Sequence, residues 1–183
     1  MTTNFFRGYV GIHTTSFKDL LLRDELRRAI ASCGFEHPSE VQQQCLPQSL
    51  LGLDVLCQAK AGMGKTAVFV LTVLNRLGDL TNENSTDVSC LVLAHTRELA
   101  YQIAKEFDRF SQNLNYKTQV IIGGENQEEQ IKRLKDEKPQ IVVATPGRLL
   151  SFIKKGIIDA KNVKIFIIDE CDKMLKELGN RSA

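Results

Sequence analysis

The sequence predicts an α/β fold in which a mainly parallel sheet is flanked by helices on both faces. Five short runs rich in β-branched residues recur along the 183 residues. Each run is apolar almost throughout rather than alternating, which is typical of strands covered on both faces. Helical patterns separate the runs, and strands alternating with helices indicate parallel βαβ units. The expected strands are 54–59, 88–94, 118–122, 140–144 and 163–168.

Helical patterns precede, separate and follow these strands. Residues 18–33 form an amphipathic pattern, and Gly34 stands where a glycine commonly ends a helix. A second helix is expected over 39–51 with Ser39 as its N-cap. The segment 78–87 is rich in Asn, Thr and Ser and is predicted to be a loop. The remaining expected helices are 65–77, 96–110, 126–136 and 147–154.

Composition favours an ordinary globular domain. Hydrophobic residues make up 43% of the chain and charged residues 25%, so disordered and fibrous classes are excluded. The net charge is only +2, which argues neither for nor against a nucleic-acid partner. Any case for such a partner must therefore come from motifs.

Cysteine usage and apolar runs predict a soluble, intracellular protein with no membrane contact. The five cysteines are scattered without a C-x-x-C pair, which suits neither a zinc site nor a disulfide framework. We expect reduced, mostly buried thiols. Residues 1–11 lack the pattern of a secretory signal, and the longest apolar run, 67–74, is too short to cross a bilayer.

A glycine-rich segment after the first expected strand predicts a phosphate-binding loop. Residues 59–66 read A-K-A-G-M-G-K-T, with Ala59 where a strict P-loop has Gly. Glycines let backbone N–H groups close around phosphate oxygens, and the following helix directs its positive end at them. An ordinary strand-to-helix turn is the alternative, but strand, loop and helix fall in the order that phosphate binding requires. The candidate residues are Ala61, Gly62, Met63, Gly64, Lys65 and Thr66, with Lys65 reaching the β- and γ-phosphates and Thr66 binding Mg²⁺.

A second nucleotide signal follows the fifth expected strand. Asp169 and Glu170 emerge at its carboxyl end, which is the edge where open α/β sheets bind ligands. Asp169 is placed to hold Mg²⁺, through water, and Glu170 to orient the attacking water. The alternative is a solvated helix start, since carboxylates favour a helix N-terminus. The phosphate loop earlier in the chain favours the nucleotide interpretation.

These motifs together resemble the first RecA-like domain of DEAD-box RNA helicases. The resemblance implies a three-layer RecA-like P-loop NTPase fold that uses ATP and Mg²⁺. Residues 169–172 read D-E-C-D in place of D-E-A-D, and this variant is typical of the branch that acts in spliceosome assembly and nuclear mRNA export. The segments 34–42 and 55–60 also resemble that branch. Its members imply a nuclear location and splicing and mRNA-export proteins as partners.

The resemblance assigns adenine recognition to two residues upstream of the phosphate loop. Gln42 corresponds to the glutamine that hydrogen-bonds adenine, and Phe17 resembles the aromatic residue that stacks on the ring. A core residue at a helix start is the alternative for Phe17. Ala61 stands where many relatives have Ser or Thr, so one side-chain contact near the phosphates is absent.

Three further motifs imply sequence-independent contacts with the RNA backbone. Residues 96–100 read T-R-E-L-A, with His95 where the family pattern has Pro, and a glycine pair and T-P-G-R follow later strands. Backbone N–H groups and Arg side chains at such helix starts can meet phosphates without reading bases. Turn and capping chemistry is the alternative for each motif taken singly. The implied RNA-binding residues are Thr96, Arg97, Gly123, Gly124, Thr145, Pro146, Gly147 and Arg148.

The resemblance also predicts the domain organisation. Residues 1–16 are expected to be an extension and 17–183 the first helicase domain, ending before the family's Ser-Ala-Thr motif and second RecA-like domain. The parent activity would be ATP-dependent unwinding of RNA or remodelling of RNA–protein complexes. The rival is a module that binds nucleotide or a protein partner without turnover. A P-loop kinase or transporter ATPase is disfavoured, because such proteins have no reason to carry Gln42 and the T-P-G-R helix start.

Overall fold

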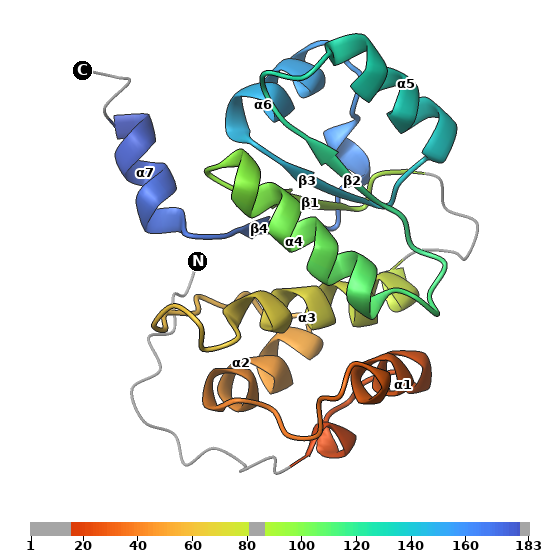
Figure 1. The fold of residues 1–183 in the computed structure, drawn as a ribbon, viewed down its shortest axis with the longest axis vertical. Helices are drawn as coiled ribbons and strands as arrows, with labels where there is room; N and C mark the ends of the chain where they lie inside the picture. The colour runs from red at the N-terminus through yellow and green to blue at the C-terminus, as the bar shows by residue number, and fades with distance from the viewer. Residues whose placement is uncertain (1–15, 81–86, 180–183) are drawn as a thin grey trace.

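The computed structural model describes residues 16–80 and 87–179, which form seven α-helices, two short 3₁₀ helices and four strands (Figure 1). The strands are β1 (Cys90–Leu93), β2 (Thr118–Ile121), β3 (Ile141–Ala144) and β4 (Ile165–Ile168). The α-helices are α1 (Asp24–Ser32), α2 (Glu40–Leu50), α3 (Lys65–Leu80), α4 (Arg97–Phe110), α5 (Gln127–Glu137), α6 (Pro146–Lys154) and α7 (Cys171–Gly179). The 3₁₀ helices are η1 (Phe17–Asp19) and η2 (Ala160–Asn162).

The four strands form one parallel sheet in the order β2-β3-β1-β4. Successive side chains of a strand point to opposite faces, and β1 shows this in its packing. Cys90 and Val92 belong to the core shared with α3 and α4, whereas Leu91 belongs to the core shared with α5 and α6. The expected α/β fold with helices on both faces is therefore confirmed.

The two faces of the sheet are covered by different helices (Figure 1). On one face, α3 and α4 contribute fully buried side chains such as Leu74 and Phe107. Helices α1 and α2 form a further layer beneath α3 in the same view. On the other face, Leu149 and Phe152 of α6 pack with Leu134 of α5. Each face of the sheet thus has its own hydrophobic core.

The first predicted helix is divided in two. Residues 17–19 form η1, and the chain is extended at Leu20 and at Arg23 before α1 begins. The side chain of Asn75 in α3 explains the break, because it accepts a hydrogen bond from the Arg23 N–H at 2.8 Å and donates one to the Leu21 carbonyl at 3.3 Å. These two bonds satisfy backbone groups that a continuous helix would otherwise pair internally. A tertiary contact therefore overrides the local helical pattern.

Helix α3 is longer than predicted. It runs to Leu80, so Gly78 is helical although 78–87 was expected to be a loop. The missing side chain of Gly78 leaves the space that the Arg23 guanidinium fills. Residues 81–86 of that expected loop lie outside the described residues.

The predicted strand 54–59 is wrong. In the described part of the chain this segment pairs with no strand, and Leu53, Val55 and Leu56 are exposed. An apolar run becomes a strand only where a neighbour offers hydrogen bonds and covers its side chains. Among the described strands, β4 pairs only with β1, and its Phe166 is 54% exposed, so the expectation that this strand is fully buried is also wrong.

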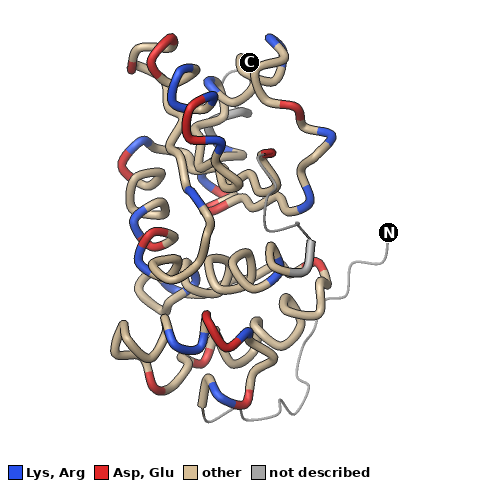
Figure 2. The backbone as a smooth tube through the Cα atoms, turned by 90° about the vertical axis from the view of Figure 1, so that its right-hand side faces the viewer, with Lys and Arg blue, Asp and Glu red and all other residues tan. Residues whose placement is uncertain are grey.

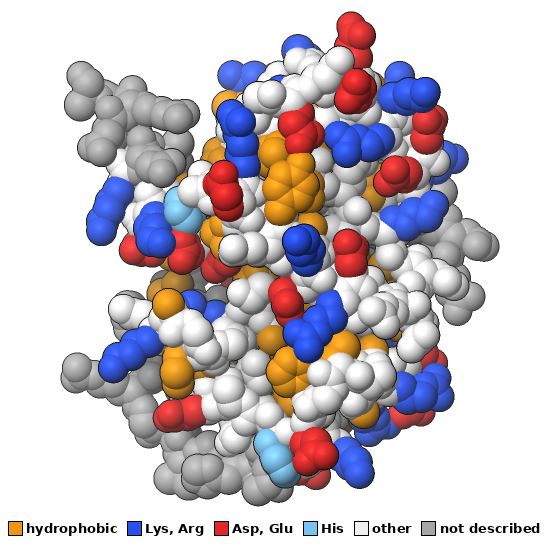
Figure 3. Space-filling view, in the orientation of Figure 1, with side chains coloured by type: hydrophobic (Ala, Val, Ile, Leu, Met, Phe, Trp, Pro, Cys, Tyr) orange, Lys and Arg blue, Asp and Glu red, His pale blue; other side chains and the backbone are white. Residues whose placement is uncertain are grey.

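The cysteines and the charged residues are scattered over the fold (Figure 2). The five cysteines are free, as expected, but only Cys90 is buried, so the prediction of mostly buried thiols is wrong. Burial raises the pKa of the Cys90 thiol. Basic and acidic residues are interspersed along the chain in Figure 2, and both signs occur among hydrophobic side chains on the face in Figure 3. Among the described helices, none is long and apolar enough to cross a bilayer.

Candidate functional site at the carboxyl edge of the sheet

All four strands end at the same edge of the sheet, because they are parallel. The predicted motifs therefore meet there, as ligand-binding groups do in open α/β sheets. The T-R-E-L-A motif follows β1, the glycine pair follows β2, T-P-G-R follows β3 and D-E-C-D follows β4. The order of the strands places the first three motifs side by side and the fourth next to the end of β1.

The phosphate loop has the backbone conformation of an anion-binding turn. Gly62 and Gly64 have φ of +80° and +83°, in the left-handed region that favours glycine, and α3 begins directly afterwards at Lys65. The Lys65 ammonium donates to the carbonyls of Ala59 and of Lys60, the latter at 3.1 Å. Lys65 thus folds back over its own loop and must turn outward to meet phosphate oxygens.

Gln42 joins helix α2 to the phosphate loop. Its side-chain carbonyl accepts from the Ser39 N–H at 3.0 Å, closing a capping box, and its amide donates to the Gly64 carbonyl at 3.2 Å. A Cβ on Gly64 would lie 2.6 Å from the Gln42 amide nitrogen, so this approach needs glycine. The Ser39 hydroxyl donates to the Met63 carbonyl at 2.9 Å. The predicted adenine-reading residue is therefore held against the predicted phosphate loop.

The other predicted nucleotide-binding residues differ in burial. Phe17 is 5% exposed and belongs to the main hydrophobic core, which matches its alternative as a core residue. Its stacking on adenine stays a prediction. Ala61 is exposed on the loop, and Thr66 is half-buried in the first turn of α3, at the end that favours anions.

The carboxylate of Asp169 lies within electrostatic reach of the phosphate loop. Burial raises the pKa of Asp169, while a hydrogen bond from the Glu170 N–H at 3.0 Å and the charge of Lys65 act to lower it. The pKa of Asp169 is raised overall, so the charge of Lys65 does not fully offset the cost of burying the carboxylate. A divalent cation bound beside it would supply the missing positive charge. The residues present thus fit a magnesium–nucleotide complex, with Asp169 and Thr66 as candidate ligands.

Glu170 is held in an unusual conformation. Its φ of +49° lies in the left-handed region, which costs a non-glycine residue on the order of 1 kcal/mol or more and is typical of functional sites. One carboxylate oxygen, Oε2, lies 2.8 Å from the Lys173 ammonium and 3.3 Å from Nδ1 of His95. Sequence reasoning assigned no role to His95, although its replacement of the family's Pro was a visible signal.

Seven of the eight predicted RNA-binding residues line one groove of about 600 Å³. The eighth, Gly124, lies beside it with φ of +87°, and a Cβ there would come within 2.4 Å of the Arg97 guanidinium. The groove residues from the predicted set are Thr96, Arg97, Gly123, Thr145, Pro146, Gly147 and Arg148. His95, Glu98, Ser151 and Met174 complete the lining.

The groove's two arginines are positioned by contacts that the sequence did not indicate. Arg148 donates to the Gln130 side-chain carbonyl and to the Glu125 backbone carbonyl, each at 3.0 Å. Gln130 is itself fully buried and donates to the Glu125 carboxylate at 2.9 Å. Arg97 lies against Gly124. The Arg148 guanidinium is therefore pre-oriented, which lowers the entropy lost when it binds phosphate.

A parallel sheet with a glycine-rich loop before a helix, and with a D-E carboxylate pair at the carboxyl end of β4, has the features of the P-loop class of nucleotide-binding domains. The DEAD/DEAH box helicase family model matches residues 39–183, and the chain belongs to this family.

Curated relatives and a solved structure agree with this assignment. The chain is 57% identical over 95% of its length to ATP-dependent RNA helicase SUB2 of Lodderomyces elongisporus, covering 40% of that protein. It is 54% identical over 96% of its length to DEAD-box ATP-dependent RNA helicase 56 of Oryza sativa subsp. japonica, again covering 40%. The crystal structure of a DEAD box protein from Methanococcus jannaschii matches with a TM-score of 0.81 and 40% identity, over 88% of this chain and 43% of that one. The chain thus spans less than half the length of these proteins.

Proposed function

We propose that this chain is the ATP-binding domain of an RNA helicase that unwinds RNA or remodels RNA–protein complexes in pre-mRNA splicing and mRNA export. Such a protein would work in the nucleus beside splicing and export proteins. The D-E-C-D motif and the similarity to a protein named SUB2 support this branch.

One observation carries the proposal: the nucleotide motifs and the RNA motifs lie along the same edge of the sheet. The residues that follow β1 line the groove, and one of them, His95, lies 3.3 Å from the Glu170 carboxylate. Energy released at one site can therefore act on the other over a short distance. A plain nucleotide-binding module has no need of a second groove built from two helix starts and a glycine-containing loop.

The residues of the phosphate loop and of the D-E pair have separate roles in phosphoryl transfer. The N–H groups of the phosphate loop and the Lys65 ammonium bind the phosphates, and Thr66 and Asp169 hold the metal. A bound Mg²⁺ supplies positive charge that stabilises the developing charge on the γ-phosphate. Glu170 orients the attacking water and accepts its proton. At the groove, N–H groups at the starts of α4 and α6 meet RNA phosphates without reading bases.

The test compares two proteins by steady-state phosphate release with and without single-stranded RNA. One is the 183-residue chain, and the other is a two-domain form in which the part of the Lodderomyces relative that follows its matched segment is joined to it. We expect the chain to bind ADP and ATP yet hydrolyse ATP barely above background. An arginine supplied by another domain contributes roughly 10³- to 10⁵-fold in related NTPases, so the two-domain form should turn over faster and respond to RNA. Strong RNA-stimulated turnover by the chain alone would contradict this division of labour.

The Gln42 amide predicts a preference for adenine nucleotides. Its carbonyl and N–H₂ can meet the donor and acceptor of the adenine edge, whereas guanine presents a different order. We expect ADP to bind at least about tenfold more tightly than GDP, the value of one or two net hydrogen bonds. Isothermal titration calorimetry on the chain measures both affinities.

Two variants on the same helix sharpen this measurement. Gln42→Glu keeps the acceptor that closes the capping box with Ser39 but removes the amide donor. The ratio of the ADP affinity to the GDP affinity should therefore fall towards one. Gln44→Ala is the matched control, because Gln44 is exposed and contacts only Glu40 among the described side-chain hydrogen bonds. Equal ADP and GDP affinities in the unmodified chain would refute the role of Gln42.

A further inference from the structure

His95 stands at the border between the groove and the nucleotide site. It follows β1, which lies between β3 and β4 in the sheet. The end of β3 carries the T-P-G-R helix start, and the end of β4 carries Asp169 and Glu170. The next residue, Thr96, caps helix α4 by accepting a hydrogen bond from the Leu99 N–H at 3.1 Å. His95 is therefore attached directly to a helix start that faces the groove.

The His95 ring is half-buried and lies against Glu170. Its side chain is 11% exposed, it lines the groove, and Nδ1 lies 3.3 Å from Oε2 of Glu170. Nδ1 is a buried atom that makes no hydrogen bond in this arrangement. A buried polar atom without a partner costs about 1–3 kcal/mol, so a small rotation that turns this contact into a hydrogen bond is favoured.

Lys173 competes for the same carboxylate oxygen. It donates to Oε2 of Glu170 at 2.8 Å, but its side chain is 55% exposed. Exposed ion pairs contribute little, because water screens them and the lysine loses rotamer freedom. A largely enclosed imidazole samples fewer rotamers, and its charge interactions are less screened. Lys173 therefore holds the Glu170 carboxylate only weakly, and the more enclosed His95 ring offers the same oxygen a second partner.

We propose that His95 is a positioning residue that makes the orientation of Glu170 depend on occupancy of the RNA groove. This inference rests on the proposed function, because it takes the groove as the RNA site and Glu170 as the residue that orients water. RNA phosphate bound at the start of α4 fixes the backbone at Thr96, and the adjoining ring then loses its freedom to turn away from Glu170. A proline, which the family pattern has at this position, carries no side-chain nitrogen that reaches a carboxylate.

The coupling must act in both directions. If RNA favours one orientation of Glu170, then a nucleotide that favours the same orientation strengthens RNA binding by the same factor. The prediction can therefore be tested by binding alone, on the 183-residue chain. The probes are a fluorescein-labelled ten-nucleotide oligouridylate and the magnesium complex of the non-hydrolysable analogue AMP-PNP.

The experiment measures the RNA dissociation constant with and without saturating analogue in three proteins. The unmodified chain should show a ratio of at least about fivefold, the low end of typical allosteric coupling. His95→Leu should bring the ratio within twofold of one, whatever its affinity for RNA alone, because a direct loss of groove contacts weakens RNA binding equally with and without the analogue and cancels in the ratio. His95→Asn should restore the coupling, because its amide nitrogen can stand where Nδ1 stands. A loss of packing alone would not be rescued by this smaller polar residue.

A spectroscopic measurement tests the contact itself. In a chain labelled with ¹⁵N-histidine, the His95 ring signals are those that vanish in His95→Asn. RNA should shift its Nδ1 signal, and Glu170→Gln should shift it in the absence of RNA. Coupling that persists in His95→Leu, or an Nδ1 signal that Glu170→Gln does not move, overturns the inference while leaving the proposed function intact. Failure of the unmodified chain to bind RNA or nucleotide overturns the proposed function, and this inference with it.

Discussion

Glu170→Gln should lower kcat for RNA-stimulated ATP hydrolysis by the two-domain form by about 10²- to 10⁴-fold, the usual contribution of a general base. Glutamine has the shape of glutamate and can still accept a hydrogen bond from His95. It lacks the charge needed to take a proton from water, so the substitution isolates the chemical role of the carboxylate. Affinities for ATP and RNA should change by less than about threefold, because this interaction gains its strength in the transition state.

A matched control separates this effect from a general change in surface charge. Glu106→Gln removes the same charge from α4, where Glu106 pairs with Arg109 on the surface at 3.8 Å. Its turnover should equal that of the unmodified protein. Phosphate release at saturating ATP and RNA gives kcat for each variant. If Glu170→Gln kept more than a tenth of the turnover, another group would have to be the base.

The layers of the fold could be predicted from the sequence because local patterns decided them. Strand β3 (Ile141–Ala144) is apolar at every position, and it is buried on both faces. The Ser39 capping box and the positive φ of Gly34 were likewise set by neighbouring residues. By contrast, the break before α1 depends on Asn75, which is 52 positions from Arg23. No pattern within a helical turn contains that information.

The failed strand at 54–59 has the same kind of cause. Its apolar run reads like that of the strand in 140–144, yet β3 has a strand on each side and 54–59 has none in the described residues. Pairing is a property of the whole sheet, so two similar runs can have different structures. A local pattern gives the tendency to form a strand and leaves the partner undecided.

The groove could be predicted from the topology of the sheet, without any knowledge of its chemistry. Once three motifs each follow a parallel strand, they must meet at one edge of the sheet. The contact between His95 and Glu170 could not be predicted, because it requires β1 and β4 to be neighbours although they are separated by β2 and β3 in the chain. The partners of Arg148 were missed as well, since Gln130 in α5 gives no signal in the sequence.

Lys65 offers the second large effect. In this structure its ammonium closes the phosphate loop by donating to the carbonyls of Ala59 and Lys60. Binding phosphate exchanges these neutral partners for charged oxygens, and hydrogen bonds to charged groups are the stronger kind. Lys65→Ala should therefore weaken ATP binding by at least ~1.5 kcal/mol, or roughly tenfold or more in Kd.

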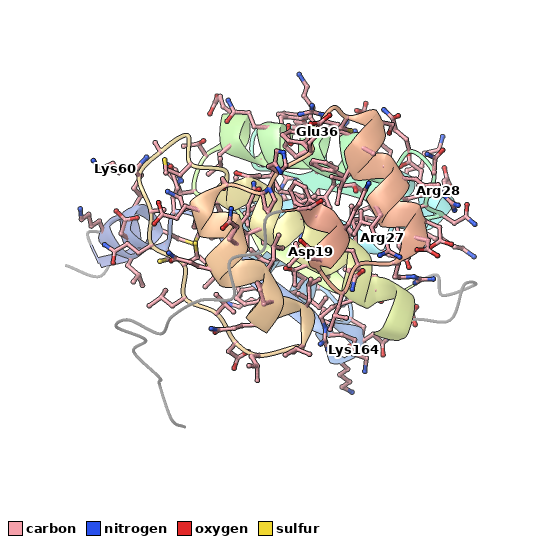
Figure 4. The ribbon with its side chains drawn as sticks, turned by 90° about the horizontal axis from the view of Figure 1, so that it is seen from below. Asp19, Arg27, Arg28, Glu36, Lys60 and Lys164 are labelled. Atoms are coloured by element: carbon pink, nitrogen blue, oxygen red, sulfur yellow. The ribbon has the colours of Figure 1, made fainter. Side chains whose placement is uncertain are left out.

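Calorimetry on the 183-residue chain measures the ATP affinity in the presence of Mg²⁺. Lys60→Ala is the matched control, because Lys60 lies in the same loop but its side chain projects outward at the periphery of the molecule (Figure 4). Lys60→Ala removes the same charge as Lys65→Ala, so a long-range electrostatic effect would lower the ATP affinity of both variants alike. We expect Lys60→Ala to stay within about twofold of the unmodified chain, since exposed charges are well screened. Equal ATP affinities in the Lys65→Ala variant and the unmodified chain would disprove the phosphate-loop assignment.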